Sequence, residues 1–138
     1  MRLNRDEAWS LLRASDHGVL ATVHPARGVD AVPVVFAVDG DRILLPVDTV
    51  KAKSTTRLQR LVNLAADPRC AVLVDHYDED WTKLWWVELQ GTAAVLDGAA
   101  AGAALDALAR RYAPYRSARP PGPVVAVTPR RWAWWSAS

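Results

Sequence analysis

The sequence predicts an antiparallel β-barrel with peripheral helices, a mainly β architecture of about six to seven strands. Short runs rich in valine, leucine and alanine recur along the chain, and Pro, Gly and Asp residues separate them. Helical spacing of apolar residues appears in the segments between these runs. No internal repeat or linker divides the 138 residues, so residues 1–138 are expected to form a single domain.

The first half of the chain predicts one helix followed by strands. Asn4 precedes Glu7 by three residues, as in a capping box at the start of a helix. Three β-rich runs follow, and their short connections predict an antiparallel meander. These runs cover residues 17–25, 29–40 and 42–47. Pro33 lies inside the second run, which indicates an edge strand, a bulge, or a stretch that faces something other than a neighbouring strand.

The second half alternates helices and strands. Helices are predicted over residues 54–66 and 97–112, and strands over residues 69–77, 84–96 and 124–137. The first of these helices has Leu58, Leu61, Val62 and Ala65 on one face. Residues 113–123 are Pro-rich and predict an irregular loop.

The seven tryptophans are many for this length, and most are expected to fill the core. Because side chains alternate along a strand, Trp85 and Trp86 should point to opposite faces. Trp132 and Trp134 should likewise face one way and Trp135 the other. The outward tryptophans would cover a helix, a partner subunit or a ligand.

Composition excludes several classes of protein. The 51% hydrophobic and 23% charged content is that of an ordinary globular chain. No apolar run reaches the roughly eighteen residues of a membrane span, and the N-terminus lacks the apolar stretch of a signal peptide. The single cysteine, Cys70, cannot form an internal disulfide. These features predict a cytoplasmic protein without a membrane association.

Positive charge is concentrated in one segment. Lys51, Lys53, Arg57 and Arg60 lie between residues 49 and 66, where no acidic residue occurs. The start of a helix combined with lysine, arginine and hydroxyl side chains is typical of a phosphate site. A basic helix face in water explains the same pattern equally well. The net charge of +2 is too small to indicate a nucleic-acid partner.

Residues 75–87, DHYDEDWTKLWWV, combine acidic and aromatic side chains. Their carboxylates lie in a predicted connection between strands, where exposed acids keep ordinary pKa values and general acid–base catalysis is unsupported. The three histidines have no metal-binding spacing, so no metal site is predicted. Cys70 lies in an apolar run and is expected to be a buried hydrophobe rather than a nucleophile. No catalytic residue is assigned.

Three segments carry a resemblance to a known family: residues 18–38 (GVLATVHPARGVDAVPVVFAV), 51–69 (KAKSTTRLQRLVNLAADPR) and 73–96 (LVDHYDEDWTKLWWVELQGTAAVL). With the order of elements, they resemble the pyridoxamine-phosphate-oxidase-like proteins, whose fold is an FMN-binding-protein-like split β-barrel. More closely, the chain is similar to the actinobacterial branch of deazaflavin (coenzyme F420)-dependent oxidoreductases. The resemblance runs over nearly the whole chain.

The resemblance implies a homodimer with two cofactor sites at the subunit interface. The positions that would hold the cofactor phosphate are Thr49, Lys51, Lys53, Arg57 and Arg60. The tricyclic ring would lie along Val32, Pro33, Val34 and Val35. Aromatic walls for the ring or the substrate would come from Tyr77, Trp81 and Trp85.

The implied function is an oxidoreductase that uses reduced deazaflavin to transfer hydride to a small unsaturated or conjugated molecule. The cofactor supplies the chemistry in such an enzyme, so the lack of a nucleophile motif is expected. An FMN-dependent oxidase or reductase on the same fold is one alternative. The other is a non-catalytic binder of deazaflavin or of another flat anionic cofactor, such as haem or bilin.

Overall fold

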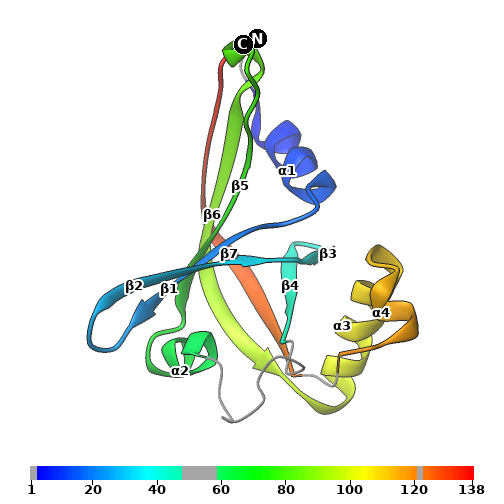
Figure 1. Cartoon of the computed structure of the whole chain (residues 1–138). Coiled ribbons are helices and arrows are strands. Elements are labelled where there is room, and N and C mark those ends of the chain that lie inside the picture. Colours follow the sequence, from blue (N-terminus) through cyan, green and yellow to red (C-terminus); the bar gives the residue numbers. More distant parts are fainter. Residues whose placement is uncertain (1–2, 48–58, 121–122) are drawn as a thin grey trace.

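The computed structural model describes residues 3–47, 59–120 and 123–138. In these ranges the strands form one antiparallel sheet of seven strands, in the order β2-β1-β5-β6-β7-β4-β3. The strands are β1 (Gly18–His24), β2 (Gly28–Val34), β3 (Ala37–Asp39), β4 (Arg42–Pro46), β5 (Arg69–His76), β6 (Trp85–Leu96) and β7 (Val124–Ser136). The helices are α1 (Arg5–Ala14), α2 (Gln59–Ala66), the short 3-10 helix η1 (Trp81–Lys83), α3 (Gly98–Arg111) and α4 (Pro114–Ser117). The predicted mainly β architecture with peripheral helices is confirmed (Figure 1).

The second predicted β run divides into two strands at opposite edges of the sheet. β2 pairs with β1, and β3 pairs with β4. Between them the chain leaves the sheet at Val35 and Phe36, and the Phe36 side chain is 1% exposed. The predicted run over residues 29–40 therefore pairs with the run before it through β2 and with the run after it through β3. This agrees with the predicted meander, except that the run is two strands rather than one. Pro33 lies in edge strand β2, which is one of the placements its position predicted.

Tyr112 stabilises the turn between β2 and β3. The backbone N–H of Phe36 donates to the Tyr112 hydroxyl at 3.0 Å. The carbonyl oxygens of Phe36 and Asp16 lie 2.5 and 3.0 Å from that hydroxyl, as acceptors for its proton. Burial raises the pKa of Tyr112, so the hydroxyl keeps this proton at neutral pH. One side chain at the end of α3 thus links the turn to the segment between α1 and β1.

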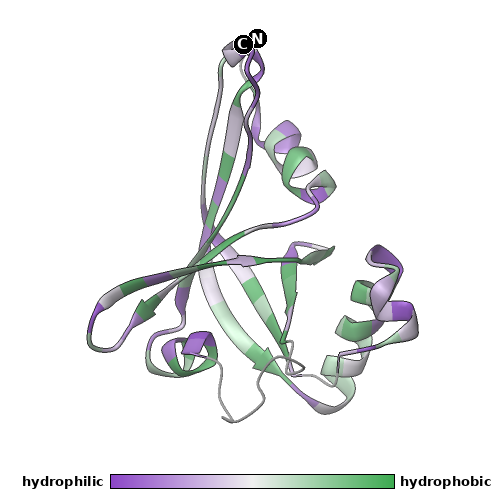
Figure 2. Cartoon of the chain, viewed as in Figure 1, coloured by the Kyte–Doolittle hydropathy of each residue, from purple (hydrophilic) through white to green (hydrophobic). Residues whose placement is uncertain are grey.

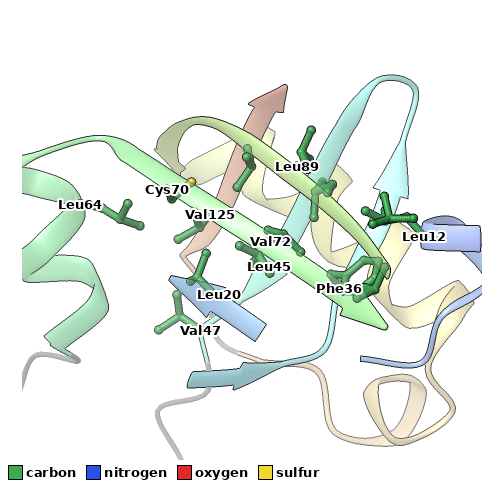
Figure 3. Packing of buried hydrophobic residues seen from close by; sticks show 14 of the residues in the cluster. Leu12, Leu20, Phe36, Leu45, Val47, Leu64, Cys70, Val72, Leu89 and Val125 are labelled. Carbon is green, nitrogen blue, oxygen red and sulfur yellow. The ribbon is translucent and has the colours of Figure 1, made fainter. Parts of the chain in front are cut away.

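One face of the sheet carries the main core. Figure 3 shows Leu20, Leu45, Val72, Leu89 and Val125 close together at the centre of this cluster. Leu12 of α1 and Leu64 of α2 belong to the same cluster. A second cluster forms where Leu105 and Leu108 of α3 pack against β3, β4 and β7. In Figure 2 much of the hydrophobic colour lies on the strands, including parts of β1 and β2.

Most sequence-based predictions for individual elements hold, with two exceptions. The capping box of Asn4 and Glu7 is present at the start of α1. The expected buried face of α2 is wrong in part, because Ala65 is exposed whereas Asn63 and Leu64 are buried. Residues 113–123, expected to be irregular, contain the short helix α4, which begins with a proline as many helices do. No described helix has the length and apolar character needed to span a membrane.

The polar side chain of Asn63 can be buried because its amide forms hydrogen bonds that connect α2 to the sheet. Its Nδ2 atom donates to Thr22 Oγ1 at 2.9 Å and to Asp30 Oδ2 at 2.8 Å. Its Oδ1 atom accepts a hydrogen bond from Gln59 Nε2 at 2.9 Å. The hydrogen bond from Asn63 is the largest cause of the lowered pKa of Asp30, to which Arg27 also contributes. These contacts fix α2 beneath the β1–β2 ribbon (Figure 1).

Candidate functional site

The sheet has a second face, opposite the core, which we call the outer face. It is formed by alternate residues of β1, β2, β5, β6 and β7, and the cross-strand register places them on one side. Its residues are Val19, Ala21, Val23, Val29, Ala31, Pro33, Ala71, Leu73, Asp75, Trp86, Glu88, Gln90, Arg131, Ala133 and Trp135. α1 and α2 pack against the core on the other side of the sheet, whereas α3 covers the continuation of the outer side over β3, β4 and the start of β7.

Large apolar side chains remain accessible on the outer face. Val19 and Leu73 are each 37% exposed, and Trp135 is 45% exposed. Their neighbours on the inner side of the same strands, such as Leu20 and Val74, are 1% exposed. A contiguous accessible apolar surface of this kind is typical of a ligand or protein contact site.

The first cavity of the outer face, which we call the basic cavity, has a volume of about 510 Å³. Ala21, Val23, Val29 and Ala71 provide apolar lining. Arg69, Arg130 and Arg131 also line it, and they make this end of the face positive. The guanidinium of Arg69 also pairs with Asp67 at 2.6 Å and lowers the pKa of that carboxyl to about 2.

A β-bulge brings the two adjacent arginines to this cavity. The register between β6 and β7 shifts at Gln90 and Gly91, so that Gln90 pairs with Arg131 while Gly91 pairs with Pro129. Arg130 is the extra residue of the bulge. A Cβ atom on Gly91 would collide with the carbonyl oxygen of Thr128, so only glycine permits this close approach of the strands.

The second cavity, which we call the aromatic cavity, lies at the opposite end of the same face and has a volume of about 420 Å³. Its lining residues are Leu73, Asp75, His76, Tyr77, Leu84, Trp85, Trp86, Glu88 and Trp135. Trp86 and Trp135 are cross-strand partners and face outward. Trp85 points to the core side and stacks on His76, with ring centroids 6.1 Å apart. The expected opposite orientations of Trp85 and Trp86, and of Trp134 and Trp135, are confirmed.

The acidic residues beyond the aromatic cavity shape a turn. Asp80 accepts hydrogen bonds from the backbone N–H and the hydroxyl of Thr82 and thereby caps η1. These bonds lower the pKa of Asp80. Asp78 accepts from the backbone N–H of Asp80 at 2.8 Å. The predicted polar connection between two strands is therefore correct, and these two carboxylates have structural partners.

The residues expected to hold a phosphate are largely outside the described part of the chain. Thr49, Lys51, Lys53 and Arg57 fall within residues 48–58, which the structure does not describe. Arg60 lies in α2, close to the connection of this helix to β1 and β2 through Asn63. The phosphate assignment therefore remains a prediction.

The four residues expected to border the ring do not share one orientation. Pro33 is exposed and belongs to the outer face, in register with Val19 and Leu73. Val32 and Val34 point to the other side and pack against the core. Val35 follows the end of β2 and is partly buried. The side chain of Pro33 therefore faces the same surface as the two cavities, whereas those of Val32 and Val34 do not.

The expected aromatic residues are divided as well. Tyr77 and Trp85 line the aromatic cavity. Trp81 lies in η1, is 67% exposed and is not among the lining residues. Sequence reasoning missed Arg130, Arg131 and Trp135 as site residues. The double arginine directly before the tryptophan-rich end of β7 was the available signal for them.

Cys70 takes no part in nucleophilic chemistry at neutral pH. Its side chain belongs to the core cluster and is 7% exposed. Burial raises the pKa of the thiol to about 11, so the reactive thiolate is scarce. The expectation of a buried, hydrophobe-like cysteine is confirmed.

Comparisons with known proteins agree with this architecture. The model of the pyridoxamine 5'-phosphate oxidase family matches residues 5–136. No curated protein sequence matches the chain. A conserved hypothetical protein from Mycobacterium tuberculosis superposes with a TM-score of 0.80 at 23% identity, over 98% of this chain and 86% of that chain.

Two further solved structures are of proteins named for the cofactor that they bind. A heme binding protein from Mycobacterium smegmatis has a TM-score of 0.74 and 22% identity, over 92% of this chain and 51% of that one. An FAD-binding protein from Mesorhizobium loti has a TM-score of 0.74 and 16% identity, over 100% of this chain and 98% of that one. At these identities the similarity establishes the fold, and the expected split β-barrel is confirmed.

Proposed function

Because the chain belongs to the pyridoxamine 5'-phosphate oxidase family, we propose that it is an oxidoreductase that uses reduced deazaflavin (coenzyme F420) to reduce a small unsaturated or conjugated molecule. The observation that carries the proposal is the pair of cavities on one open apolar face, one rimmed by arginines and the other by tryptophans. A flat ring with an anionic tail needs such a combination of apolar surface and positive charge. The choice of deazaflavin is supported by the resemblance of residues 73–96.

The residues of the outer face fit a cofactor of this kind. A ring placed beside Pro33 would lie on Val19 and Leu73, which belong to the same row of the sheet. β2 is an edge strand, so one side of its backbone is not paired with another strand of the described sheet. The phosphate would be held by the residues between Thr49 and Arg60, whose charges and hydroxyls suit it.

The side chains of this chain would bind and orient rather than react. A bound reduced deazaflavin would supply the hydride. Tyr77, Trp86 and Trp135 would give the substrate a flat apolar wall and keep water away from it. Solvent would supply the proton, since the sequence offers no identifiable proton donor. We further propose that the enzyme is a homodimer, because a single copy leaves both cavities on an uncovered apolar face.

The test is a side-by-side titration of the purified protein with deazaflavin and FMN, followed by a hydride-transfer assay with a panel of unsaturated acceptors. Replacing both Lys51 and Lys53 with alanine should weaken deazaflavin binding at least about tenfold, roughly 1.4 kcal/mol, through the loss of charge-assisted phosphate contacts. The control is Arg13→Ala with Arg110→Ala, which removes the same charge from exposed positions of α1 and α3.

The outcomes of these experiments distinguish the proposed deazaflavin-dependent enzyme from its two alternatives. Tighter binding of FMN, with the visible spectrum of a yellow protein, would instead support an FMN-dependent oxidase or reductase. Tight binding of deazaflavin with no transfer to any acceptor would indicate a non-catalytic binder. Equal deazaflavin affinity in the lysine variant and the control would refute the phosphate assignment.

A further inference from the structure

We propose that the aromatic cavity binds an organic cation, so that the substrate of the proposed enzyme carries a protonated or quaternary ammonium group beside its unsaturated part. The inference rests on the proposed function, which places the substrate against the aromatic side chains of this cavity, and it adds the charge of that substrate. The observations that carry it are the carboxylates and the exposed rings of the lining, which come from Asp75, Glu88, Tyr77, Trp86 and Trp135.

The formal charges that line the aromatic cavity are negative. Asp75 and Glu88 provide carboxylates, and no lysine or arginine is among the lining residues in the described part of the chain. His76 also lines the cavity, but its Nε2 atom lies 3.8 Å from Oδ2 of Asp78, so a positive charge on this ring would have its own carboxylate partner. The connection after β5 adds further carboxylates at residues 78–80. The potential in this cavity is therefore negative, whereas that of the basic cavity is positive.

The strand register places both carboxylates next to one tryptophan. Asp75 of β5 lies directly opposite Trp86 of β6, and Trp86 in turn lies opposite Trp135 of β7. Glu88 follows Trp86 by two residues and so points to the same face, about 7 Å further along the strand. Asp75 and Glu88 are diagonal neighbours on adjacent strands, a relation that separates Cα atoms by about 7–8 Å. A positive group over the Trp86 ring would therefore lie within reach of both carboxylates.

Neither carboxylate has a cationic partner within the described ranges. The ion pairs there include neither Asp75 nor Glu88. Oε1 of Glu88 accepts a hydrogen bond from the neutral amide of Gln90 at 2.9 Å. Arg131 lies opposite Gln90, in the next row of the outer face, and lines the basic cavity rather than this one. The negative charges of Asp75 and Glu88 are therefore available to a ligand.

The aromatic side chains favour an organic cation over a metal ion. The face of an indole ring attracts an ammonium group, and the methyl or methylene groups around the nitrogen bury apolar surface against the ring. Tyr77, Trp86 and Trp135 have exposed rings that can serve in this way. A metal ion instead needs several ligands at one point, and no group of three or more His, Cys, Asp or Glu residues in the described ranges could hold one. The lining therefore matches a protonated or alkylated amine.

The opposite charges of the two cavities would also keep two ligands apart. An anionic cofactor is attracted by Arg130 and Arg131 of the basic cavity and repelled by the carboxylates of the aromatic cavity. A cationic substrate has the reverse preference. Each ligand would therefore bind at its own end of the outer face, although both ends offer apolar contacts.

The test compares two probes of the same shape that differ in charge, (meta-hydroxyphenyl)trimethylammonium and meta-tert-butylphenol. Isothermal titration calorimetry of the cofactor-free protein should show at least about tenfold tighter binding of the cation, since the carboxylates and the ring faces both favour it. Glu88→Gln and Asp75→Asn should each weaken binding of the cation about threefold and leave the affinity for the neutral probe unchanged. The matched control is Asp97→Asn, which removes a carboxylate that forms no capping hydrogen bond, beyond the far end of β6, and should change neither affinity.

Equal affinity of the wild type for the two probes would refute the cation site, and so would a preference for the cation that is undiminished in both carboxylate variants. Circular dichroism establishes that each variant is folded. Because the probes are titrated without deazaflavin, the result is separate from the test of the cofactor. A protein that binds the cation but not deazaflavin would support the site and refute the proposed cofactor. A protein that binds deazaflavin yet does not distinguish the probes would refute the site and leave the proposed function intact.

Discussion

Alternate residues of the same central strands form the inner and the outer face of the sheet. The two faces differ in how far their apolar side chains are buried. On the inner side Val72, Val87 and Leu89 are fully buried by helices and by the other strands. On the outer side Leu73 and Trp86 are each 37% exposed although they are just as apolar. One chain buries the inner face by itself and leaves apolar side chains of the outer face partly in water.

The difference shows that the alternating side chains of one strand can form two apolar surfaces, one on each face of the sheet. A strand with one face in water normally carries polar residues on that face. Here β1, β2 and β5 carry valine, alanine and leucine on both faces. Charged residues of the outer face include Arg69 and Asp75 in β5, and Glu88 and Arg131 in the rows between them. An accessible apolar surface of this kind is typical of a site of contact with a ligand or another protein.

The largest expected effect separates the two faces directly. Leu89→Ala should lower the free energy of unfolding by about 2–5 kcal/mol, since the side chain is fully buried in the core. Leu73→Ala, the same change on the outer face, should cost the monomeric protein only about 1–2 kcal/mol, because part of the side chain is already in water. Urea unfolding at equal protein concentration measures both. Similar losses in the two variants would contradict the distinction between the faces.

A second comparison concerns glycines on the inner side and in a helix. Gly91→Ala should destabilise the protein by about 1–3 kcal/mol, because the new Cβ would collide with the backbone of β7. Gly102→Ala should stabilise it by about 0.5–1 kcal/mol, since no atom lies within 4 Å of the new methyl group and alanine favours the helix. Thermal unfolding of both variants gives the signs. A neutral Gly91→Ala variant would show that the strands separate easily at the bulge.

The smallest effect is expected at alkaline pH and concerns a thiol on the inner side. Burial raises the pKa of Cys70 to about 11 from the ordinary value of 9.0. The unfolded chain therefore loses this proton first, and the contribution of the group to stability falls as the pH rises from about 9 to about 11. Urea unfolding should show that the wild type loses up to about 2 kcal/mol more than Cys70→Ala across this window. Equal losses in the two proteins would mean that the thiol is accessible in the folded state.

Most of the fold could be predicted from the sequence because its signals are local. The capping box of Asn4 and Glu7, the alternation of Trp85 and Trp86, and the buried run around Cys70 each depend on neighbouring residues. The strand order could not be predicted in the same way. It depends on where a run such as residues 29–40 bends, and Tyr112 stabilises that bend from far along the chain.

The candidate site was harder to predict for a physical reason. The arginines of the basic cavity come from the start of β5 and from the bulge of β7, which are distant in sequence. The burial of Asn63 could not be predicted from its helix, because its partners Thr22 and Asp30 lie in other elements. Pairings of this kind arise only when the sheet is assembled. The residues between Thr49 and Arg57 lie outside the described ranges and keep the status of a prediction.

The bulge at Gly91 also determines which residues of β7 face the core and which face outward. Before it, the odd-numbered Val125 and Val127 face the core, whereas after it the even-numbered Trp132 and Trp134 do. One additional residue, Arg130, reverses the parity of the strand. If the same residues continued in a regular register without the bulge, Arg131 would point toward the core, and Trp132 and Trp134 would point outward. The bulge therefore keeps these tryptophans on the core side and the arginine on the outer side of one strand.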